Sequence, residues 1–262
     1  MTTTLLVTTY NWPEALNCTL KSIEKQSVMP DEIIIADDGS TQETADLIKL
    51  WQQKIKTPII HSWQEDDGFR AAASRNKAIA KASGEYIIMI DGDLILHPNF
   101  ILDHIKHSKP NQFSIGTRVL LTENYSKEAI KNELHTFDIQ ADNIISNAKN
   151  KINNSFLSNL ISYKTKSYKQ VRSCNMACFK NDLVKVNGFN EDFIGWGRED
   201  TELVVRLLNA EIVRKNIKFN ANVLHIYHKE NSKKMLHAND LILEKVINQR
   251  LKRCDNGLDQ YL

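Results

Sequence analysis

The chain has 262 residues, of which 42% are hydrophobic and 25% are charged, and its formal net charge is +2. This composition is ordinary for a soluble globular protein, and the length suffices for one large α/β domain. The near-neutral charge excludes a general polyanion binder, so we expect no nucleic-acid partner.

The first hundred residues alternate between strand and helix patterns. This order predicts an α/β fold with a mainly parallel central sheet flanked by helices. Ligands in such sheets bind beyond the carboxyl ends of the strands, where two pairs of aspartates fall in this sequence. The predicted strands are 4–9, 33–36, one that begins at 59, and 86–90, and the predicted helices are 13–26, 41–54 and 74–82.

The middle of the chain has a different character. No acidic residue occurs from Asn143 to Asn181, and apolar residues between 145 and 160 recur every three or four positions, which predicts one face of a helix. This helix either rests on an anionic membrane or packs on the protein with a solvated basic face. The apolar positions are Ile145, Ala148, Ile152, Phe156 and Leu160, and the basic ones are Lys149, Lys151, Lys164, Lys166, Lys169, Arg172 and Lys180. Beyond it we predict a short helix that ends within 184–189, a helix at 200–209, a strand at 223–227 and a closing helix at 240–251.

The four cysteines are Cys18, Cys174, Cys178 and Cys254. None forms a Cys-x-x-Cys pair, which gives a zinc or redox site little support and favours a reducing cytoplasm. The N-terminus lacks the pattern of a signal peptide, and no apolar run approaches the roughly 18 residues of a membrane span. We therefore expect a cytoplasmic protein that can contact a membrane only peripherally.

Two aspartates, Asp91 and Asp93, follow the apolar run 86–90 and flank Gly92. Carboxylates this close repel each other unless a cation lies between them, and a divalent ion that bridges to a diphosphate supplies that charge. A solvated Asp-Gly turn is an equally valid interpretation of these three residues alone.

A second acidic strand end occurs at Asp37 and Asp38, where a carboxylate can accept hydrogen bonds from a base or ribose, or can simply belong to a capped turn. Between the two acidic sites lie Arg70, Arg75 and Asn76. Arginine suits bidentate contact with phosphate, although a surface pair with one of the acids at 65–67 is the alternative.

The string from Gly195 to Asp200 (GWGRED) is the most unusual in the chain. Its two glycines allow close approach of a ligand to the backbone, and Trp196 offers a flat face to a sugar ring. A carboxylate beside them can accept a proton from an acceptor hydroxyl. A helix start with acids in its first turn accounts for those acids, but not for the glycines and the tryptophan.

Two histidines, His225 and His228, are spaced to complete a metal site near a predicted strand end. Either of them alone is more simply explained as a packed or exposed side chain.

Together these strings resemble the family 2 glycosyltransferases of the GT-A fold, and in particular the glycosyltransferase modules of bacterial chondroitin polymerases. The ordered set is far more specific than any single motif. The matching stretches are 7–11 (VTTYN), 36–40 (ADDGS), 63–70 (WQEDDGFR), 74–78 (SRNKA) and 90–93 (IDGD). Residues 174–177 (CNMA) and 195–203 also resemble the C-terminal motif of β-1,4-galactosyltransferases, although Arg198 replaces a glycine there.

The resemblance implies an inverting transferase that uses a UDP-sugar, with Asp200 as the catalytic base. Asp93 and His228 would bind a metal, Mn²⁺ or alternatively Mg²⁺, and His225 stands where the galactosyltransferases have a methionine ligand. The residues expected to bind the donor are Thr9, Tyr10, Asp38, Arg70, Arg75, Asn76, Asp91 and Gly92. Those expected around the acceptor and the donor sugar are Trp196, Gly197, Glu199 and Asn175.

The resemblance also divides the chain, within one structural domain, into a nucleotide-sugar-binding half (1–110), a variable basic helical segment (111–172) and an acceptor-binding, catalytic half (173–262). The acceptor would be a glycan or a lipid-linked oligosaccharide of a bacterial surface polysaccharide. A catalytically inactive nucleotide-sugar-binding scaffold is the alternative. A nicotinamide oxidoreductase fits the α/β pattern, but no Gly-x-Gly-x-x-Gly follows the first strand.

Overall fold

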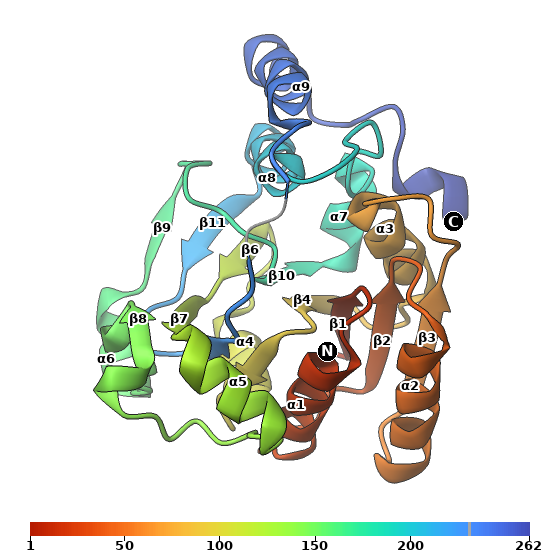
Figure 1. The fold of residues 1–262 in the computed structure, drawn as a ribbon. Coiled ribbons are helices and arrows are strands. Elements are labelled where there is room, and N and C mark those ends of the chain that lie inside the picture. The colour runs from red at the N-terminus through yellow and green to blue at the C-terminus, as the bar shows by residue number, and fades with distance from the viewer. Residues whose placement is uncertain (230–231) are drawn as a thin grey trace.

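A computed structural model describes residues 1–229 and 232–262. Its main sheet has the strand order β3-β2-β1-β4-β10-β6-β11-β9, and a smaller sheet has the order β5-β12-β7-β8 (Figure 1). The strands are β1 (Thr3–Thr9), β2 (Glu32–Asp37), β3 (Ile59–Trp63), β4 (Tyr86–Asp91), β5 (Leu94–Leu96), β6 (Gln112–Ile115), β7 (Thr117–Leu121), β8 (Ile144–Ser146), β9 (Tyr163–Thr165), β10 (Asn175–Phe179), β11 (Val213–Asn216) and β12 (Asn222–His225).

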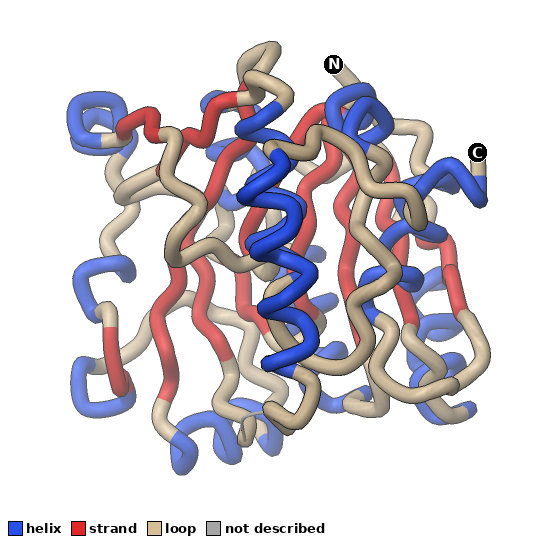
Figure 2. Tube along the Cα trace, turned by 90° about the horizontal axis from the view of Figure 1, so that it is seen from above, coloured by secondary structure: helices blue, strands red, loops and turns tan. Residues whose placement is uncertain are grey.

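Helices lie on both sides of the main sheet, and Figure 2 shows them in front of and behind the strands. The helices are α1 (Pro13–Glu24), α2 (Gln42–Lys54), α3 (Ala71–Lys81), α4 (Phe100–His107), α5 (Glu123–Lys131), α6 (Ser155–Ile161), α7 (Lys180–Val186), α8 (Glu199–Asn209) and α9 (Leu236–Gln249). Three short 3₁₀ turns are η1 (Ala141–Asn143), η2 (Ala148–Lys151) and η3 (Leu258–Tyr261).

The central strands are buried on both faces, which explains why their sequences are continuous apolar runs rather than alternating ones. In β1, Leu5 and Val7 pack in the core cluster formed with α1, α2 and α4. Leu6, between them, packs in the cluster formed with α3, α7 and α8. The pairings of β1 with β2 and β4, and of β2 with β3, are parallel. The predicted α/β fold with a mainly parallel sheet is therefore confirmed.

The antiparallel strand β10 lies between β4 and β6 and carries the sheet into the second half of the chain. The smaller sheet begins with β5, directly after Asp93, and its neighbour β12 ends at His225. This arrangement brings the ends of β4 and β12 to one place, although 134 residues separate Asp91 from His225 in the sequence.

The helix expected between residues 145 and 160 is wrong. That stretch forms the strand β8, the turn η2 and only the short helix α6. The apolar spacing was misleading because Asn147 has a left-handed backbone, with φ of 65°, which interrupts any helix between Ile145 and Ile152. The whole segment 111–172 therefore contributes strands to both sheets and is not mainly helical.

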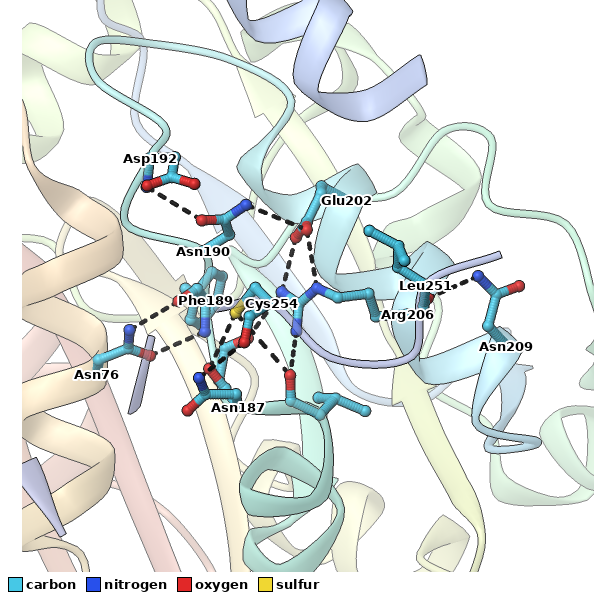
Figure 3. Close-up of polar contacts among 12 residues, drawn as sticks. Asn76, Asn187, Phe189, Asn190, Asp192, Glu202, Arg206, Asn209, Leu251 and Cys254 are labelled. Carbon is cyan, nitrogen blue, oxygen red and sulfur yellow. Dashed lines mark hydrogen bonds and ion pairs between the residues drawn. The ribbon is translucent and has the colours of Figure 1, made fainter. Parts of the chain in front are cut away.

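Helix α8 contains an ion pair with no exposed side-chain surface, between Arg206 and Glu202 (Figure 3). Arg206 Nε and Nη2 donate to the two carboxylate oxygens at 2.8 and 2.6 Å. The guanidinium also donates to the carbonyls of Val186 and Gly188, and Asn190 Nδ2 donates to Glu202 Oε1. The first turn of α8 is thereby fixed against the segment that follows α7.

All four cysteines are free and buried. Among the described residues, none of the helices combines the length and the apolar character needed to cross a bilayer.

Candidate functional site

The first part of the site lies at the carboxyl end of β2. Asp38 is buried there, where its carboxylate accepts hydrogen bonds from Gln64 Nε2 at 2.6 Å and from the Arg70 backbone N–H at 2.8 Å. Burial raises the pKa of Asp38 to about 6, although both hydrogen bonds favour the charged form. A buried carboxyl group at a strand end with a pKa this close to neutral pH is a candidate ligand-binding group.

The turn after Asp38 lies tightly against the loop that follows β3. Gly39 has φ of +98°, and a Cβ at this position would lie 2.5 Å from Asp66 Cα, so only glycine fits. Tyr10, which is half exposed, donates its hydroxyl hydrogen to Asp66 Oδ2 at 2.9 Å. Tyr10 and Asp66 thus form a rim beside the buried Asp38.

At the ends of β1 and β4, Thr9 and Gly92 lie in contact. The Gly92 N–H donates to the Thr8 carbonyl at 2.8 Å, and a Cβ on Gly92 would lie 3.3 Å from Thr9 Cβ. The neighbouring Thr8 pairs with Asp91 in the sheet register. The sequence-predicted donor residues of these two strands are therefore neighbours in space.

Arg75, on α3, is the centre of the site. Its buried guanidinium lies 3.4 Å from Asp91 Oδ1, 3.5 Å from Glu199 Oε1 and 3.8 Å from Asp200 Oδ1. Burial lowers the pKa of Arg75, but the three carboxylates together raise it above its usual value. One guanidinium thus joins the end of β4 to the start of α8, across 124 residues of sequence between Arg75 and Glu199.

The acids around Arg75 are more numerous than one cation can neutralise. Burial raises the pKa of Asp91 and of Glu199, and Arg75 opposes both shifts without cancelling them. Asp200 Oδ2 accepts a hydrogen bond from the Ser173 backbone N–H at 2.8 Å, whereas its buried Oδ1 has no hydrogen-bond partner. Excess negative charge and an unbonded carboxylate oxygen indicate a site arranged for a ligand rather than for stability.

A possible metal site lies directly beside this cluster. The Nε2 atoms of His225 and His228 lie 3.7 and 3.4 Å from Asp93 Oδ2, and the candidate ligand atoms of all three side chains fall within 4.8 Å of one another. Burial lowers the pKa of His225 to about 4, so its imidazole is neutral. The Nδ1 of His228 lies 2.8 Å from the Lys229 carbonyl, which directs the Nε2 lone pair towards Asp93.

The residues present fit a divalent transition ion. Asp93 Oδ1 is buried without a hydrogen-bond partner, and burial raises the pKa of this carboxylate, so a cation would relieve both costs. One carboxylate and two imidazoles form a donor set that can hold such an ion.

The loop before α8 closes the site from the other side. The Gly195 N–H donates to the Phe69 carbonyl at 3.1 Å, which connects this loop to the loop beside Asp38. Gly197 has φ of +107°, and its carbonyl accepts from Asn239 Nδ2 of α9 at 2.9 Å. Trp196, between the two glycines, is half-buried. Glu199 follows them and begins α8.

Two predicted site residues make structural hydrogen bonds. The buried Asn76 exchanges hydrogen bonds with the backbone of Phe189 and donates to Glu191. The buried Asn175 bonds to His104 and to the carbonyls of Thr117 and Ala221. The hydrogen-bonding atoms of both amides are thus used inside the fold, and their contact with a ligand stays a prediction.

Arg70 contributes to the site through its backbone N–H, which binds Asp38. Its side chain is half exposed and pairs with Asp67 at 2.7 Å, which is the surface pairing that the sequence left open.

Two further residues of the site, Gln64 and Arg118, were not among the expected ones. Gln64 fixes one oxygen of Asp38. Arg118, on β7, lowers the pKa of both Asp93 and His225, for which burial is the larger influence, so it lies electrostatically close to the possible metal site. Gln64 lay within a matching stretch and was a discoverable candidate, whereas Arg118 belongs to no recognisable motif.

Comparison with protein-family models identifies both halves of the chain. Residues 4–171 match the model of glycosyl transferase family 2, and residues 157–229 match the model described as the N-terminal domain of galactosyltransferase. The first match covers more than half of the chain and contains the strand ends with Asp38, Asp91 and Asp93. The second contains Asp200 and both histidines.

Relatives with assigned names support the same family. The validoxylamine A glucosyltransferase of Streptomyces hygroscopicus subsp. limoneus is 26% identical over 78% of this chain and 47% of its own length. The hyaluronan synthase of Pasteurella multocida is 26% identical over 86% of this chain and 24% of its own length. The chondroitin synthase of Escherichia coli is 24% identical over 78% of this chain and 32% of its own length. The chain thus spans a quarter to a half of the length of these relatives.

The fold matches that of solved structures. S. aureus TarS aligns over all of this chain and 41% of its own, with a TM-score of 0.64 and 14% identity. A shorter TarS fragment in complex with UDP aligns over all of this chain and 68% of its own, with a TM-score of 0.63 and 15% identity. The architecture is therefore that of GT-A transferases.

Proposed function

Since the chain belongs to glycosyl transferase family 2, we propose that it moves a hexose or N-acetylhexosamine from a UDP-sugar to a hydroxyl of a glycan acceptor, with inversion. The observation that carries this proposal is the Asp200 carboxylate. One of its oxygens is held by the Ser173 N–H, while the other is buried, unbonded and 3.8 Å from Arg75. A carboxylate prepared in this way is suited to accept a proton.

The donor would bind across the strand ends. Asp38 is positioned to accept a hydrogen bond from the uracil or ribose, and Tyr10 at the rim is positioned to contact the base. Asp91 would face the ribose and sugar, beside Arg75. The UDP complex of the TarS fragment supports a UDP-sugar as the donor class. A divalent ion, Mn²⁺ or Mg²⁺, held by Asp93, His228 and His225 would neutralise negative charge on the diphosphate.

The chemical step is a single in-line displacement. The acceptor oxygen attacks the anomeric carbon, the bond from that carbon to UDP breaks, and the acceptor proton passes to Asp200 Oδ1. Arg75, 3.8 Å from Asp200 Oδ1, would offset the negative charge that develops on the departing UDP. Because attack and departure occur on opposite faces of the carbon, the configuration inverts.

Glu199 has a different role from its neighbour. Burial and the adjacent Asp200 raise its pKa, which favours the protonated form. A neutral carboxyl group can donate a hydrogen bond to a sugar hydroxyl. Trp196 would offer an apolar face to the same sugar. In this proposal 1–110 holds the donor and 173–262 the acceptor and the base, within one domain.

The names of the relatives support a polysaccharide acceptor. Two of them are named hyaluronan synthase and chondroitin synthase, which supports a role in bacterial surface polysaccharide or lipooligosaccharide synthesis. A lipid-linked oligosaccharide would place the enzyme at the cytoplasmic face of the inner membrane, and four free cysteines suit that reducing compartment.

A donor screen tests the proposal. The protein is incubated with Mn²⁺, a panel of UDP-hexoses and UDP-N-acetylhexosamines and a mixture of oligosaccharides, and released UDP is measured. We expect release with at least one donor, and its loss in Asp200→Asn but not in Asp182→Asn, a half-buried carboxylate on α7. UDP binding without release or transfer for any donor would favour the alternative, an inactive nucleotide-sugar-binding scaffold.

A further inference from the structure

Helix α6 exposes its apolar side chains and buries a polar one, which is the reverse of the usual arrangement for a helix on a water-exposed surface. Its one buried residue is a serine, Ser158, while Phe156 is 73% exposed and Leu160 is 66% exposed. Leu157 and Ile161 are exposed as well. A surface helix normally buries its apolar side, so this inversion indicates that something apolar lies outside α6.

The inversion is fixed by hydrogen bonds. Ser158 Oγ lies 3.0 Å from His107 Nε2 and 3.2 Å from Ser162 Oγ. The Asn154 side chain caps the first turn, and the Asn154 N–H donates to the Phe219 carbonyl at 2.8 Å. Rotating α6 to bury its leucines would break this polar anchor, so the outward apolar face belongs to the fold.

The apolar surface continues beyond the helix. Ile152, just before α6, is 47% exposed, and Tyr163, just after it, is 52% exposed. Elsewhere, exposed leucines stand singly on their helices, as Leu50 does on α2 and Leu241 on α9. We call the surface formed by residues 152, 156, 157, 160, 161 and 163 the α6 face. It lies at the left edge of the molecule in Figure 1.

Lysines gather around the α6 face. Burial and the charges of Lys164 and Lys109 lower the pKa of Lys215, whose Nζ donates to the Ser162 carbonyl. Burial and the charges of Lys149 and Arg214 lower the pKa of Lys218. The sequence from 143 to 181 contains no acidic residue. An exposed apolar surface with lysines beside it fits a partner that is both apolar and negatively charged.

We propose that the α6 face docks on an anionic phospholipid bilayer, with Phe156 and Leu160 inserted among the acyl chains and the surrounding lysines on the lipid phosphates. Exposed apolar side chains and flanking lysines are the two components of interfacial membrane binding. A second copy of the chain would bring the same lysines together, which the charge pattern opposes. The docking itself does not rest on the proposed transfer reaction.

The docking surface is connected to the candidate metal site through β12. Asn222, at the start of β12, donates to the carbonyls of Asn150 and Ile152, and His225 ends the strand. Four residues of strand span about 10 Å. An acceptor anchored in the bilayer would thus be presented within a short reach of the reacting groups.

Vesicle flotation of the full chain tests the docking. Vesicles of phosphatidylglycerol mixed with phosphatidylcholine are compared with vesicles of phosphatidylcholine alone, at low salt. We expect the wild type to float with the anionic vesicles and Phe156→Ser/Leu160→Ser to lose at least tenfold in partitioning. The matched control, Leu50→Ser/Leu241→Ser, removes equally exposed leucines elsewhere and should float like the wild type.

A second variant tests the electrostatic part. Lys149→Gln/Lys164→Gln should weaken flotation severalfold and reduce its dependence on salt, because fewer lipid counterions are displaced. Equal flotation of the wild type and the serine variant would overturn the proposal. So would a solution dimer that the serine variant dissolves, if neither form binds vesicles. Circular dichroism verifies folding, and UDP binding in solution should stay unchanged, so a failed transferase assay leaves this result interpretable.

Discussion

Helix α8 takes part in two arginine–carboxylate clusters, one turn apart, that differ in their geometry. The Arg206 cluster (Arg206 and Glu202) has contacts of 2.6 and 2.8 Å, and its remaining donors reach backbone carbonyls. The Arg75 cluster (Arg75, Asp91, Glu199 and Asp200) has contacts of 3.4 to 3.8 Å and leaves a buried oxygen of Asp200 unbonded. We call the Arg206 cluster closed because its polar atoms have hydrogen-bond partners, and the Arg75 cluster open because one buried oxygen has none.

The contrast separates structural charge from functional charge. A buried ion pair is tolerated when every donor and acceptor is satisfied, and Arg206 meets that condition (Figure 3). Three carboxylates around one Arg75 do not meet that condition, so the fold retains a local excess of negative charge. Mutations in the two clusters should therefore affect different properties.

The largest effect is expected for Asp200→Asn in the Arg75 cluster. Turnover should fall by about 10²- to 10⁴-fold, because the amide cannot accept the acceptor proton. Stability should be unchanged or slightly raised, since one of three crowded charges is removed. Steady-state kinetics, UDP titration and thermal melting measure this. Normal turnover in the variant would remove Asp200 from the base role.

Arg206→Met should have the converse effect. Loss of one partner leaves Glu202 buried and uncompensated, which costs about 3–5 kcal/mol of unfolding free energy. Urea denaturation measures this loss, while turnover per folded molecule should be retained. The matched double variant Glu202→Leu/Arg206→Met should recover most of the stability. A loss below about 1 kcal/mol in the single variant would contradict the closed-cluster interpretation.

Metal binding should reduce the charge excess of the open site. Mn²⁺ at about 100 times its dissociation constant should raise the unfolding free energy by about 2.7 kcal/mol. Asp93→Asn should abolish that gain, and comparing His225→Gln with His228→Gln shows whether both imidazoles bind. Thermal melting with and without Mn²⁺ is the measurement. An equal gain in Asp93→Asn would place the metal elsewhere.

Asp38 predicts a smaller, pH-dependent effect. Its folded pKa of about 6 lies above that of the unfolded chain, so the native state keeps the proton longer. The contribution of Asp38 to the free energy of unfolding is complete below about pH 4 and is lost as the pH rises through 6. The free energy of unfolding of Asp38→Asn should therefore exceed that of the wild type by about 1–2 kcal/mol at pH 7 and equal it at pH 4.

The fold can accept this amide, because Gln64 Oε1 is buried without a partner and a flipped Gln64 can accept from the new amide. UDP binding should weaken at least tenfold. Denaturation curves at both pH values and calorimetric titration with UDP give the readouts. A destabilised variant at pH 7 would show that Asp38 stabilises the fold.

Arg198→Gly is expected to have the smallest effect. Arg198 has φ of +82°, a conformation that costs a side chain roughly 1 kcal/mol and glycine very little. The change also removes an exposed pair with Asp240, which contributes about 0–1 kcal/mol. We expect a stability change within about 0.5 kcal/mol, measured by urea denaturation. A large loss would show that the pair holds α9 against α8.

Local sequence patterns were sufficient to predict the first half of the fold. The strands β1, β2 and β4 are continuous apolar runs that end in acids, and a parallel sheet puts such ends at one edge. Asp38, Asp91 and Asp93 were predictable for that reason. The matching motifs added Asp200 and the two histidines, which the fold brings beside them.

The roles of several other residues depend on long-range contacts that local patterns do not reveal. Asn76 and Asn175 stand in matching motifs, but their partners lie up to 115 residues away, and those partners make them structural. Arg118 is close to the metal site only because β7 pairs with β12. The apolar periodicity of 145–160 predicted one face of a helix that either rests on a membrane or packs on the protein. The stretch instead forms only the short helix α6, which Ser158 and its bond to His107 turn outward. Local patterns specify secondary structure, but the long-range contacts that satisfy each polar group decide what a side chain does.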